Sequence, residues 1–335
     1  IAAILRAHAG DNAVLATSGN LNNDIGMPLM LLRLRSAHRF AVIEMGMNHL
    51  GEIRYLTNLA HPTVAVINNA GTAHIGELGS REAIAQAKGE IYEGLQPGVA
   101  VINADDRYAD YWRSLNAARE SVTFGFGVAA SVRGEIAADG ALRVRADGAD
   151  YRVKLPVLGE HNVRNALAAC AVAHVLRIPD SAIRAGLGHF ENAKGRLQRV
   201  EGKAGATVID DSYNANPDSA KAAAQVLGGC KGTRILVLGD MGELGEDGAA
   251  MHAEVGAVAR EAGIDRLFTL GTLSASAAKA FGSNARHFAD LETLCAELER
   301  LLAADVTVLV KGSRFMRMER VVARIVQGDH TVGAH

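Results

Sequence analysis

The stretch from Val64 to Leu95, VAVINNAGTAHIGELGSREAIAQAKGEIYEGL, shows the pattern on which most of the chain is built. Its first five residues are mostly apolar and do not alternate, which is typical of a parallel strand buried on both faces. Ser80 is a good N-cap for the helix that follows. Ile84, Lys88 and Ile91 are spaced as on one helix face, so we expect Lys88 to project from an apolar stripe. A lysine there reaches solvent, finds a counter-charge or loses its proton.

The composition is that of an ordinary globular protein. The 335 residues are 49% hydrophobic and 21% charged, a length that suggests two domains. The 35 basic and 37 acidic residues are interspersed and aromatics make up 4%, which argues against a nucleic-acid partner. Three widely separated cysteines, Cys170, Cys230 and Cys295, fit reduced thiols in the cytoplasm. No apolar run is long enough to cross a bilayer, so we expect no membrane insertion.

Several further apolar segments end in polar residues and are followed by a helical pattern: 39–46, 99–103, 207–209, 235–238 and 306–310. Ligands of open parallel sheets bind beyond the carboxyl ends of the strands, so these polar ends are expected to form a binding rim. From 122 to 157 the period changes to two, and Asp139-Gly140 and Asp147-Gly148 are strong hairpin turns. The pattern predicts an α/β fold: a central, mostly parallel sheet flanked by helices, with an antiparallel β meander, followed by a smaller Rossmann-like α/β domain.

The boundary between the two domains is expected near 193, with a central domain over 1–193 and a C-terminal domain over 194–335. The segment 1–9 resembles the middle of an amphipathic helix without a cap. We therefore expect the chain to begin partway through a larger protein.

Three residues on consecutive strand–helix units suggest a cation site. Glu44 follows a strand and offers the hard oxygen ligands that magnesium prefers. His74 alone is weak evidence for a metal ligand, because a histidine in a loop is more often only solvated. Lys88 cannot ligate as an ammonium, but a desolvated amine can add carbon dioxide to form an anionic carbamate with two oxygens.

A loop rich in asparagine follows the first short strand. Asn20, Asn22 and Asn23 lie within four positions. Asparagine tolerates left-handed backbone and caps helices, so the loop could simply be a set of turns. Alternatively, its polar side chains could bind a ligand that carries carboxylates or amides.

Eight segments resemble the Mur ligase superfamily: IEMGMNHLGEI, NNAGTAHIGELGS, AKGEI, GEHNVRNALAA, GRLQRV, DDSYNANPDS, VLGDMGELG and VLVKGSRFMRME. They occur in the family's order, and the resemblance runs from 1 to about 326. Members of this superfamily form amide bonds in peptidoglycan precursors at the expense of ATP. The resemblance is strongest to the members that add D-alanyl-D-alanine to UDP-N-acetylmuramoyl-tripeptide, as the segments 17–28 and 211–219 indicate.

The resemblance implies ATP and Mg²⁺ as cofactors. It implies UDP-N-acetylmuramoyl-tripeptide and D-alanyl-D-alanine as substrates, and a monomeric protein. It implies metal ligation by Glu44, His74 and carbamylated Lys88, which would act in catalysis together with Arg196. It implies nucleotide contacts at His161, Asn162, Asn165, Arg196 and Asp211. It implies substrate contacts at Thr17, Asn20, Asn22, Asn23, Asn214, Asn216, Lys311, Ser313 and Arg314. Simpler roles stay open for three of these residues: Asn216 precedes Pro217 as an N-cap would, His161 could be a cap, and Arg314 could be solvated.

One feature of the family pattern is missing. No segment matches the phosphate-binding pattern G-x-x-x-x-G-K-[ST], and the domain that holds the UDP group in the family has no counterpart. We expect a truncated chain that is inactive alone, because backbone amides and a lysine would be missing from the phosphates. A sibling amino-acid-adding Mur ligase, a folylpolyglutamate synthase relative and a non-catalytic precursor-binding remnant remain alternatives. The sequence does not indicate whether the tripeptide ends in L-lysine or diaminopimelate.

Overall fold

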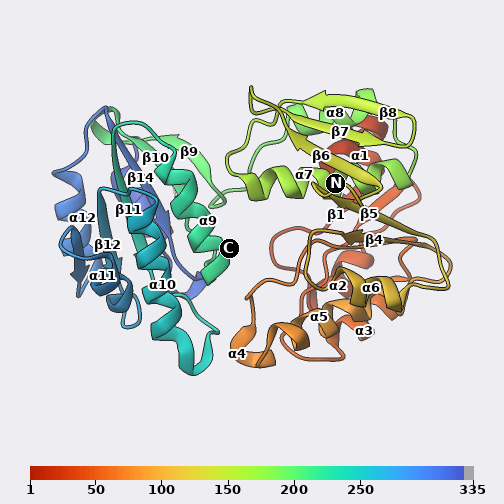
Figure 1. Ribbon diagram of the computed structural model, residues 1–335, viewed down its shortest axis with the longest axis horizontal. Coiled ribbons are helices and arrows are strands. Elements are labelled where there is room, and N and C mark those ends of the chain that lie inside the picture. Colours follow the sequence, from red (N-terminus) through yellow and green to blue (C-terminus); the bar gives the residue numbers. More distant parts are fainter. Residues whose placement is uncertain (328–335) are drawn as a thin grey trace. The chain divides into compact units, whose positions relative to one another are not determined.

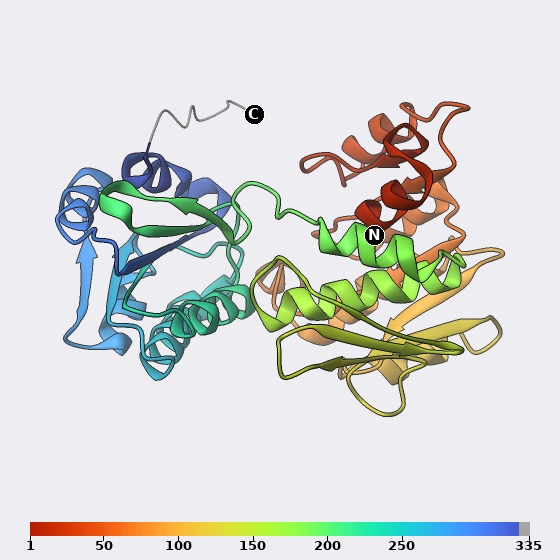
Figure 2. The same cartoon turned by 90° about the horizontal axis from the view of Figure 1, so that it is seen from above.

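The computed structural model describes residues 1–327, which form two compact units. The first unit comprises 1–71 and 78–191, and the second comprises 72–77 and the chain from 192 onward. Figures 1 and 2 show that each unit is built from a sheet with helices packed against it. Among residues 1–327, no helix is both long enough and apolar enough to cross a bilayer.

The main sheet of the first unit has six strands in the order β3-β4-β5-β6-β7-β8. The strands are β3 (Val64–Ile67), β4 (Val99–Asn103), β5 (Ser121–Gly125), β6 (Val132–Ile136), β7 (Leu142–Ala146) and β8 (Ala149–Val153). Neighbours from β3 to β6 run parallel, and β6, β7 and β8 form the expected antiparallel meander. Gly140 (φ 78°) and Gly148 (φ 71°) have the left-handed backbone that the two hairpin turns require.

Two further strands, β1 (Val14–Ala16) and β2 (Phe40–Val42), pair in parallel as a separate two-stranded sheet. The strand predicted over 39–46 is therefore shorter, and Glu44 lies just beyond its end. The expectation that β3 is buried on both faces is also wrong. Ala65 and Ile67 are buried, but Val64 and Val66, which alternate with them along the strand, are half-buried.

Helices pack around the two sheets of the first unit and against one another. They are α1 (Ala2–Ala9), α2 (Gly26–Leu31), α3 (Glu52–Ala60), α5 (Arg81–Gly89), α6 (Ala109–Leu115), α7 (Glu160–Val175) and α8 (Asp180–Gly188). Val101 packs into the core formed with α7, while Ala100 and Ile102 point to the opposite face and are equally buried. Ser80 caps α5 as predicted, by accepting a hydrogen bond from the Ala83 amide. The helix ends at Gly89, so Ile91 lies in a 3₁₀ turn instead of continuing its apolar stripe.

The second unit contains a six-stranded sheet in the order β13-β12-β11-β14-β10-β9. Its elements are α4 (Ile75–Leu78, largely in the 72–77 segment), β9 (Gln198–Glu201), β10 (Thr207–Asp211), α9 (Pro217–Gly228), β11 (Thr233–Gly239), α10 (Gly248–Glu261), β12 (Arg266–Leu270), α11 (Ala275–Phe281), β13 (Ala285–Phe288), α12 (Leu291–Glu299), β14 (Val306–Lys311) and α13 (Glu319–Ile325). Every neighbouring pair except β9–β10 is parallel. The carboxyl ends of β10, β14 and β11 therefore lie side by side, as expected for a binding rim.

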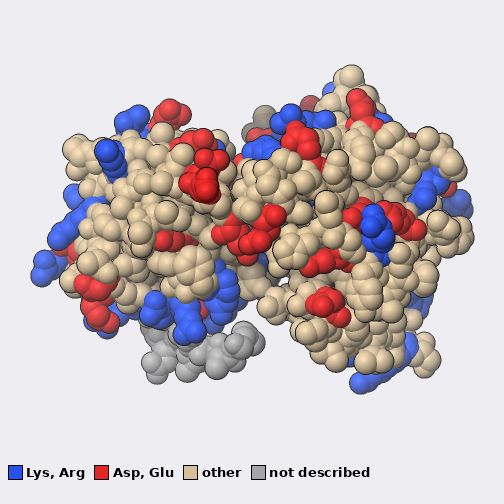
Figure 3. All heavy atoms as spheres, turned by 90° about the horizontal axis from the view of Figure 1, so that it is seen from below, with Lys and Arg blue, Asp and Glu red and all other residues tan. Residues whose placement is uncertain are grey.

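Charged residues of both signs lie on the face of the molecule that Figure 3 displays. Lys and Arg are interspersed there with Asp and Glu. This mixture agrees with the formal net charge of −2.

Candidate active site

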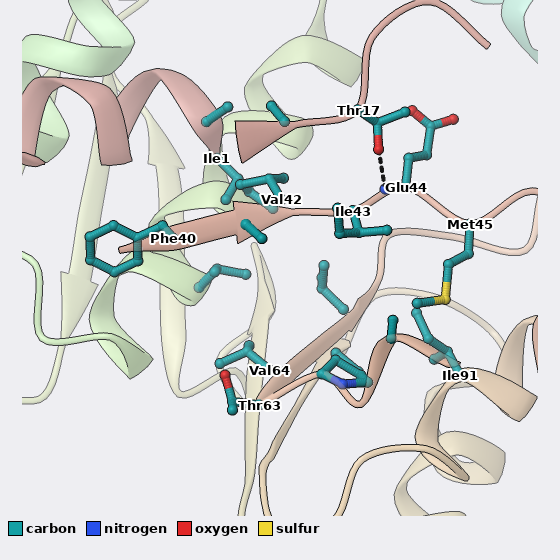
Figure 4. A pocket seen from close by; sticks show the side chains of 18 of the residues that line it. Ile1, Thr17, Phe40, Val42, Ile43, Glu44, Met45, Thr63, Val64 and Ile91 are labelled. Carbon is teal, nitrogen blue, oxygen red and sulfur yellow. Dashed lines mark hydrogen bonds between the residues drawn. The ribbon is translucent and has the colours of Figure 1, made fainter. Parts of the chain in front are cut away.

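Glu44 borders a cavity of about 790 Å³ within the first unit. Consecutive residues of both β2 and β3 line it, so the edges of these two strands contribute to its wall. Figure 4 shows the apolar side chains of Phe40, Val42 and Val64 around the opening, with Thr17 and Glu44 at its polar end. The cavity is therefore apolar along the strands and polar beyond their carboxyl ends.

Lys88 lines the same cavity, which brings it to the neighbourhood of Glu44. Burial lowers the pKa of the Lys88 amine, while the charges of Asp106 and Glu44 act in the opposite direction. A lower pKa increases the neutral fraction of the amine, which is the form that reacts with carbon dioxide. The environment of Lys88 thus suits the expected carbamate.

Asp106 also lies close enough to act on the charge of Lys88, although it was not among the predicted site residues. Its carboxylate accepts hydrogen bonds from the amides of Ala70 (2.9 Å) and Tyr108 (2.9 Å). It thereby ties the loop after β3 to the loop after β4. The strand pattern placed Asp106 among the polar residues that follow the strand 99–103, and this position was the signal for a site residue.

The asparagine-rich loop contacts the protein itself. Thr17 Oγ1 accepts a hydrogen bond from the Glu44 amide (2.9 Å), and Asn22 Nδ2 donates to Glu44 Oε1 (2.9 Å). Asn23 Oδ1 accepts from the Gly26 amide (2.7 Å) at the start of α2, and Asn20 is exposed. Substrate contacts by these four residues stay a prediction, but two of them hold Glu44 in the structure.

The two asparagines expected at the nucleotide form a chain of carboxamides. Asn68, at the end of β3, donates from Nδ2 to Asn165 Oδ1 (2.6 Å). Asn165 in turn donates to Asn162 Oδ1 (3.4 Å), and Asn162 donates to the Leu158 carbonyl (2.7 Å). The N-cap of α7 is Gly159, so His161 does not cap the helix. The chain connects β3 to the first turns of α7. Asn68 opens the family motif NNAGTAHIGELGS and ends a predicted strand, but it was not among the predicted site residues.

His74 belongs to the segment grouped with the second unit. Its Nδ1 lies 2.7 Å from Glu243 Oε2. Its backbone is left-handed (φ 63°), a conformation that residues other than glycine adopt rarely. Its role as a magnesium ligand stays a prediction.

A buried ion pair joins β10 to β14 in the second unit. Lys311 Nζ lies 2.6 Å from Asp211 Oδ2 and 3.0 Å from the Asn214 carbonyl. Asp211 Oδ1 accepts a hydrogen bond from the Leu197 amide (3.1 Å). The side chain of Lys311 is only 4% exposed, so it points into the unit, whereas we expected it at the incoming dipeptide.

Ser313 connects the loops that follow the strands β10, β11 and β14. Its hydroxyl accepts from the Gly242 amide (2.8 Å) and donates to the Ala215 carbonyl (3.0 Å). Its own amide donates to the Asp240 carbonyl (2.9 Å). These contacts use the single hydroxyl proton, so Ser313 positions the loops after β10 and β11.

The remaining predicted residues of the second unit lie at its surface or cap a helix. Asn216 caps α9 in a capping box with Ser219, with Pro217 as the first helical residue, as predicted. Arg196 stacks on the Tyr213 ring, with 4.6 Å from guanidinium carbon to ring centroid. The remaining two, Asn214 and Arg314, are exposed, and Arg314 pairs with Glu319 at 2.9 Å. Their roles in binding stay predictions.

His252 holds the loop after β11 and was not anticipated from the sequence. Its Nδ1 lies 2.6 Å from the Gly248 carbonyl and must donate, because a carbonyl only accepts. Its Nε2 is therefore the unprotonated nitrogen that accepts from the Met241 amide (2.9 Å). Burial lowers the pKa of this histidine. The ring is thus neutral and has one defined tautomer.

We expect His252 to make the second unit less stable in mild acid. An unfolded histidine titrates near pH 6.5, and the folded ring resists protonation. Below about pH 6.5 the unfolded chain gains a proton that the folded chain does not. The free energy of unfolding therefore decreases as the pH is lowered from about 6.5, by at most about 1.4 kcal/mol per pH unit, until the pKa of the folded histidine is reached.

Urea unfolding between pH 7.5 and 5 measures this dependence, and His252→Gln should flatten it. Proton NMR titration of the ring gives the folded pKa directly. A His252 pKa at or above the unfolded value of about 6.5 would contradict the prediction.

Comparison with known proteins identifies the family. The model of the Mur ligase middle domain matches residues 1–173, and that of the Mur ligase, glutamate ligase domain matches residues 195–314. The chain belongs to the Mur ligase family. The first matched range falls largely in the first unit of this Mur ligase, and the second range falls in the second unit.

Individual relatives refine the comparison. This Mur ligase is 41% identical over 329 residues to the UDP-N-acetylmuramoyl-tripeptide--D-alanyl-D-alanine ligase of Escherichia coli (strain K12), an alignment that covers 95% of this chain and 72% of that protein. Its structure is similar to that of MurF from Acinetobacter baumannii, with a TM-score of 0.89, 37% identity and coverage of 96% and 72%. MurF ligase from Thermotoga maritima, solved in complex with ADP, gives a TM-score of 0.83 at 26% identity, with coverage of 96% and 75%.

Proposed function

We propose that this protein is an ATP-dependent ligase that joins D-alanyl-D-alanine to UDP-N-acetylmuramoyl-tripeptide in the synthesis of peptidoglycan precursors. The proposal rests on the relatives named above together with one structural observation. Glu44, just beyond β2, and Lys88, on α5, border the same cavity. The three cysteines are free thiols, which supports a cytoplasmic location.

The residues present fit a magnesium ion that is bound mainly through the nucleotide. Within residues 1–327, no group of three or more His, Cys, Asp or Glu could hold a metal by itself. Magnesium is commonly bound by one or two carboxylates together with substrate phosphates and water, so Glu44 suffices as a protein ligand. We propose Glu44 and the carbamate of Lys88, which border one cavity, as its ligands in the first unit. When bound, the ion would neutralise charge on the transferred phosphoryl group.

The chemistry requires activation of a carboxylate. The terminal carboxylate of the tripeptide attacks the γ-phosphorus of ATP in line, which gives an acyl phosphate and ADP. The amine of D-alanyl-D-alanine then attacks the acyl carbon and phosphate leaves. In the first unit, the carboxamides of Asn162 and Asn165 would orient the adenine. In the second unit, Ser313 and the Lys311–Asp211 pair would hold the rim loops that meet the dipeptide.

Phosphate release by the full-length protein tests the function. We expect release from ATP only when both UDP-N-acetylmuramoyl-tripeptide and D-alanyl-D-alanine are present, with one amide formed for each phosphate. Tripeptides ending in L-lysine and in diaminopimelate should both be supplied. Mass spectrometry identifies the product.

The same assay separates the alternatives. Activity with a single amino acid in place of the dipeptide would indicate a sibling Mur ligase, and activity with a folate and glutamate would indicate a folylpolyglutamate synthase relative. Binding of the precursor without phosphate release would indicate a non-catalytic module.

A further inference from the structure

The loop 17–23 folds over the residues that follow β2. The Thr17 amide donates to the Val42 carbonyl (3.0 Å), which continues the pairing of β1 with β2 by one step. The Glu44 amide then donates to Thr17 Oγ1 (2.9 Å), and the Gly46 amide donates to the Asn22 carbonyl (2.8 Å). Figure 4 shows the contact between Thr17 and Glu44 at the edge of the cavity. The backbone around Glu44 is thus held at three successive points.

The side chain of Glu44 is held as well. Asn22 Nδ2 lies 2.9 Å from Glu44 Oε1, and the carboxamide must present its NH₂ group because a carboxylate only accepts. Gly46 leaves room for this contact, since a Cβ at that position would lie 3.0 Å from Asn22 Nδ2. Within the described part of the chain, the structure gives Oε2 no hydrogen-bond partner, so this oxygen remains open to a cation.

Such support matters because Glu44 is an exposed side chain. An exposed glutamate samples many rotamers, and binding an ion through it would cost the entropy of fixing one of them. A hydrogen bond from a neighbouring side chain offsets part of that cost before the ion arrives. Groups of this kind behind a metal ligand commonly change metal affinity about 10- to 100-fold when they are removed.

We propose that Asn22 and Thr17 are positioning residues that hold the Glu44 carboxylate for a divalent cation. The inference rests on the proposed function, which makes Glu44 a metal ligand. It assigns Asn22 a role different from direct contact with the nucleotide-linked peptide. The two roles predict different effects, because a positioning residue alters cation affinity and a peptide contact alters the KM of the peptide substrate.

Divalent-cation binding tests the inference. In the full-length protein with a non-hydrolysable ATP analogue, titration with Mn²⁺ followed by electron paramagnetic resonance reports the free ion. We expect Asn22→Leu, which keeps the volume and removes the donor, to weaken Mn²⁺ binding about 10-fold. Thr17→Val should weaken it in the same direction, and Thr17→Ser should restore it because the hydroxyl is retained. Asn58→Ala, an exposed asparagine on α3, is the matched control and should have no effect.

Glu44→Gln separates the inference from the proposed function. If Glu44→Gln leaves Mn²⁺ binding unchanged, Glu44 is not a metal ligand and the proposed function loses its cation site. If Glu44→Gln weakens binding and Asn22→Leu does not, only the positioning role is wrong. A rise in the KM of the nucleotide-linked peptide with unchanged Mn²⁺ affinity in Asn22→Leu would also overturn it.

Discussion

Replacement of Lys88 by alanine is expected to abolish ligation. Loss of one electrostatic contributor from an active site commonly costs at least about 100-fold in rate, and Lys88→Ala removes both the amine and its carbamate. The carbamate forms when the neutral amine adds carbon dioxide and releases one proton. Burial lowers the pKa of Lys88 and so favours the neutral form. The rate of phosphate release dependent on D-alanyl-D-alanine measures the effect.

Short carboxylic acids should partly restore activity to Lys88→Ala. Formate or acetate can enter the space left by the side chain and supply the oxygens that the carbamate would offer. Lys88→Arg keeps a cation, forms no such carbamate and fills the space, so it should be inactive without rescue. Lys154→Ala, an exposed lysine of the same unit, is the control and should retain activity. Full activity of Lys88→Ala in buffer without added acids would refute the role.

The second large effect is expected on stability, at the pair between Lys311 and Asp211. Both side chains are nearly inaccessible, with 4% and 12% exposed, and their charged atoms are 2.6 Å apart. Removing one partner of a buried pair leaves an uncompensated charge and typically costs about 3–5 kcal/mol. We expect Lys311→Met to lower the free energy of unfolding of the second unit by this amount, as measured by urea unfolding.

A surface pair of the same length is the matched control. Lys221 and Glu254 are also 2.6 Å apart, but 28% and 61% of their side chains are exposed. Lys221→Met should cost less than about 1 kcal/mol. The double variant Asp211→Asn, Lys311→Met should recover most of the loss, because the asparagine oxygen can still accept from the Leu197 amide. Equal costs for Lys311→Met and Lys221→Met would contradict the prediction.

The local features could be predicted because they depend on residues within a few positions of each other. Ser80 caps α5, Asn216 and Pro217 begin α9, and the Asp-Gly pairs form the hairpins, each through contacts over three or four residues. The alternation of strands and helices also followed from apolar periodicity. The family resemblance likewise came from short motifs in a fixed order.

The detailed placement of site residues could not be predicted in the same way. The apolar pattern of β2 extends to Gly46, but its pairing with β1 ends at Val42, so Glu44 lies in a loop. The family resemblance implied that Lys311 faces the incoming dipeptide, and no short-range pattern indicated its buried partner. The partner, Asp211, is 100 residues away and is brought near by the pairing of β10 with β14.

The sequence by itself determined the fold class, the helix caps and turns, and the set of polar residues at the ends of the strands. Only the tertiary structure decided which of these residues contact one another: Asn22 with Glu44, Ser313 with two other loops, and His252 with the loop after β11. The physical reason is that caps and turns satisfy backbone groups nearby in the chain, whereas the partner of a buried or rim side chain depends on strand order.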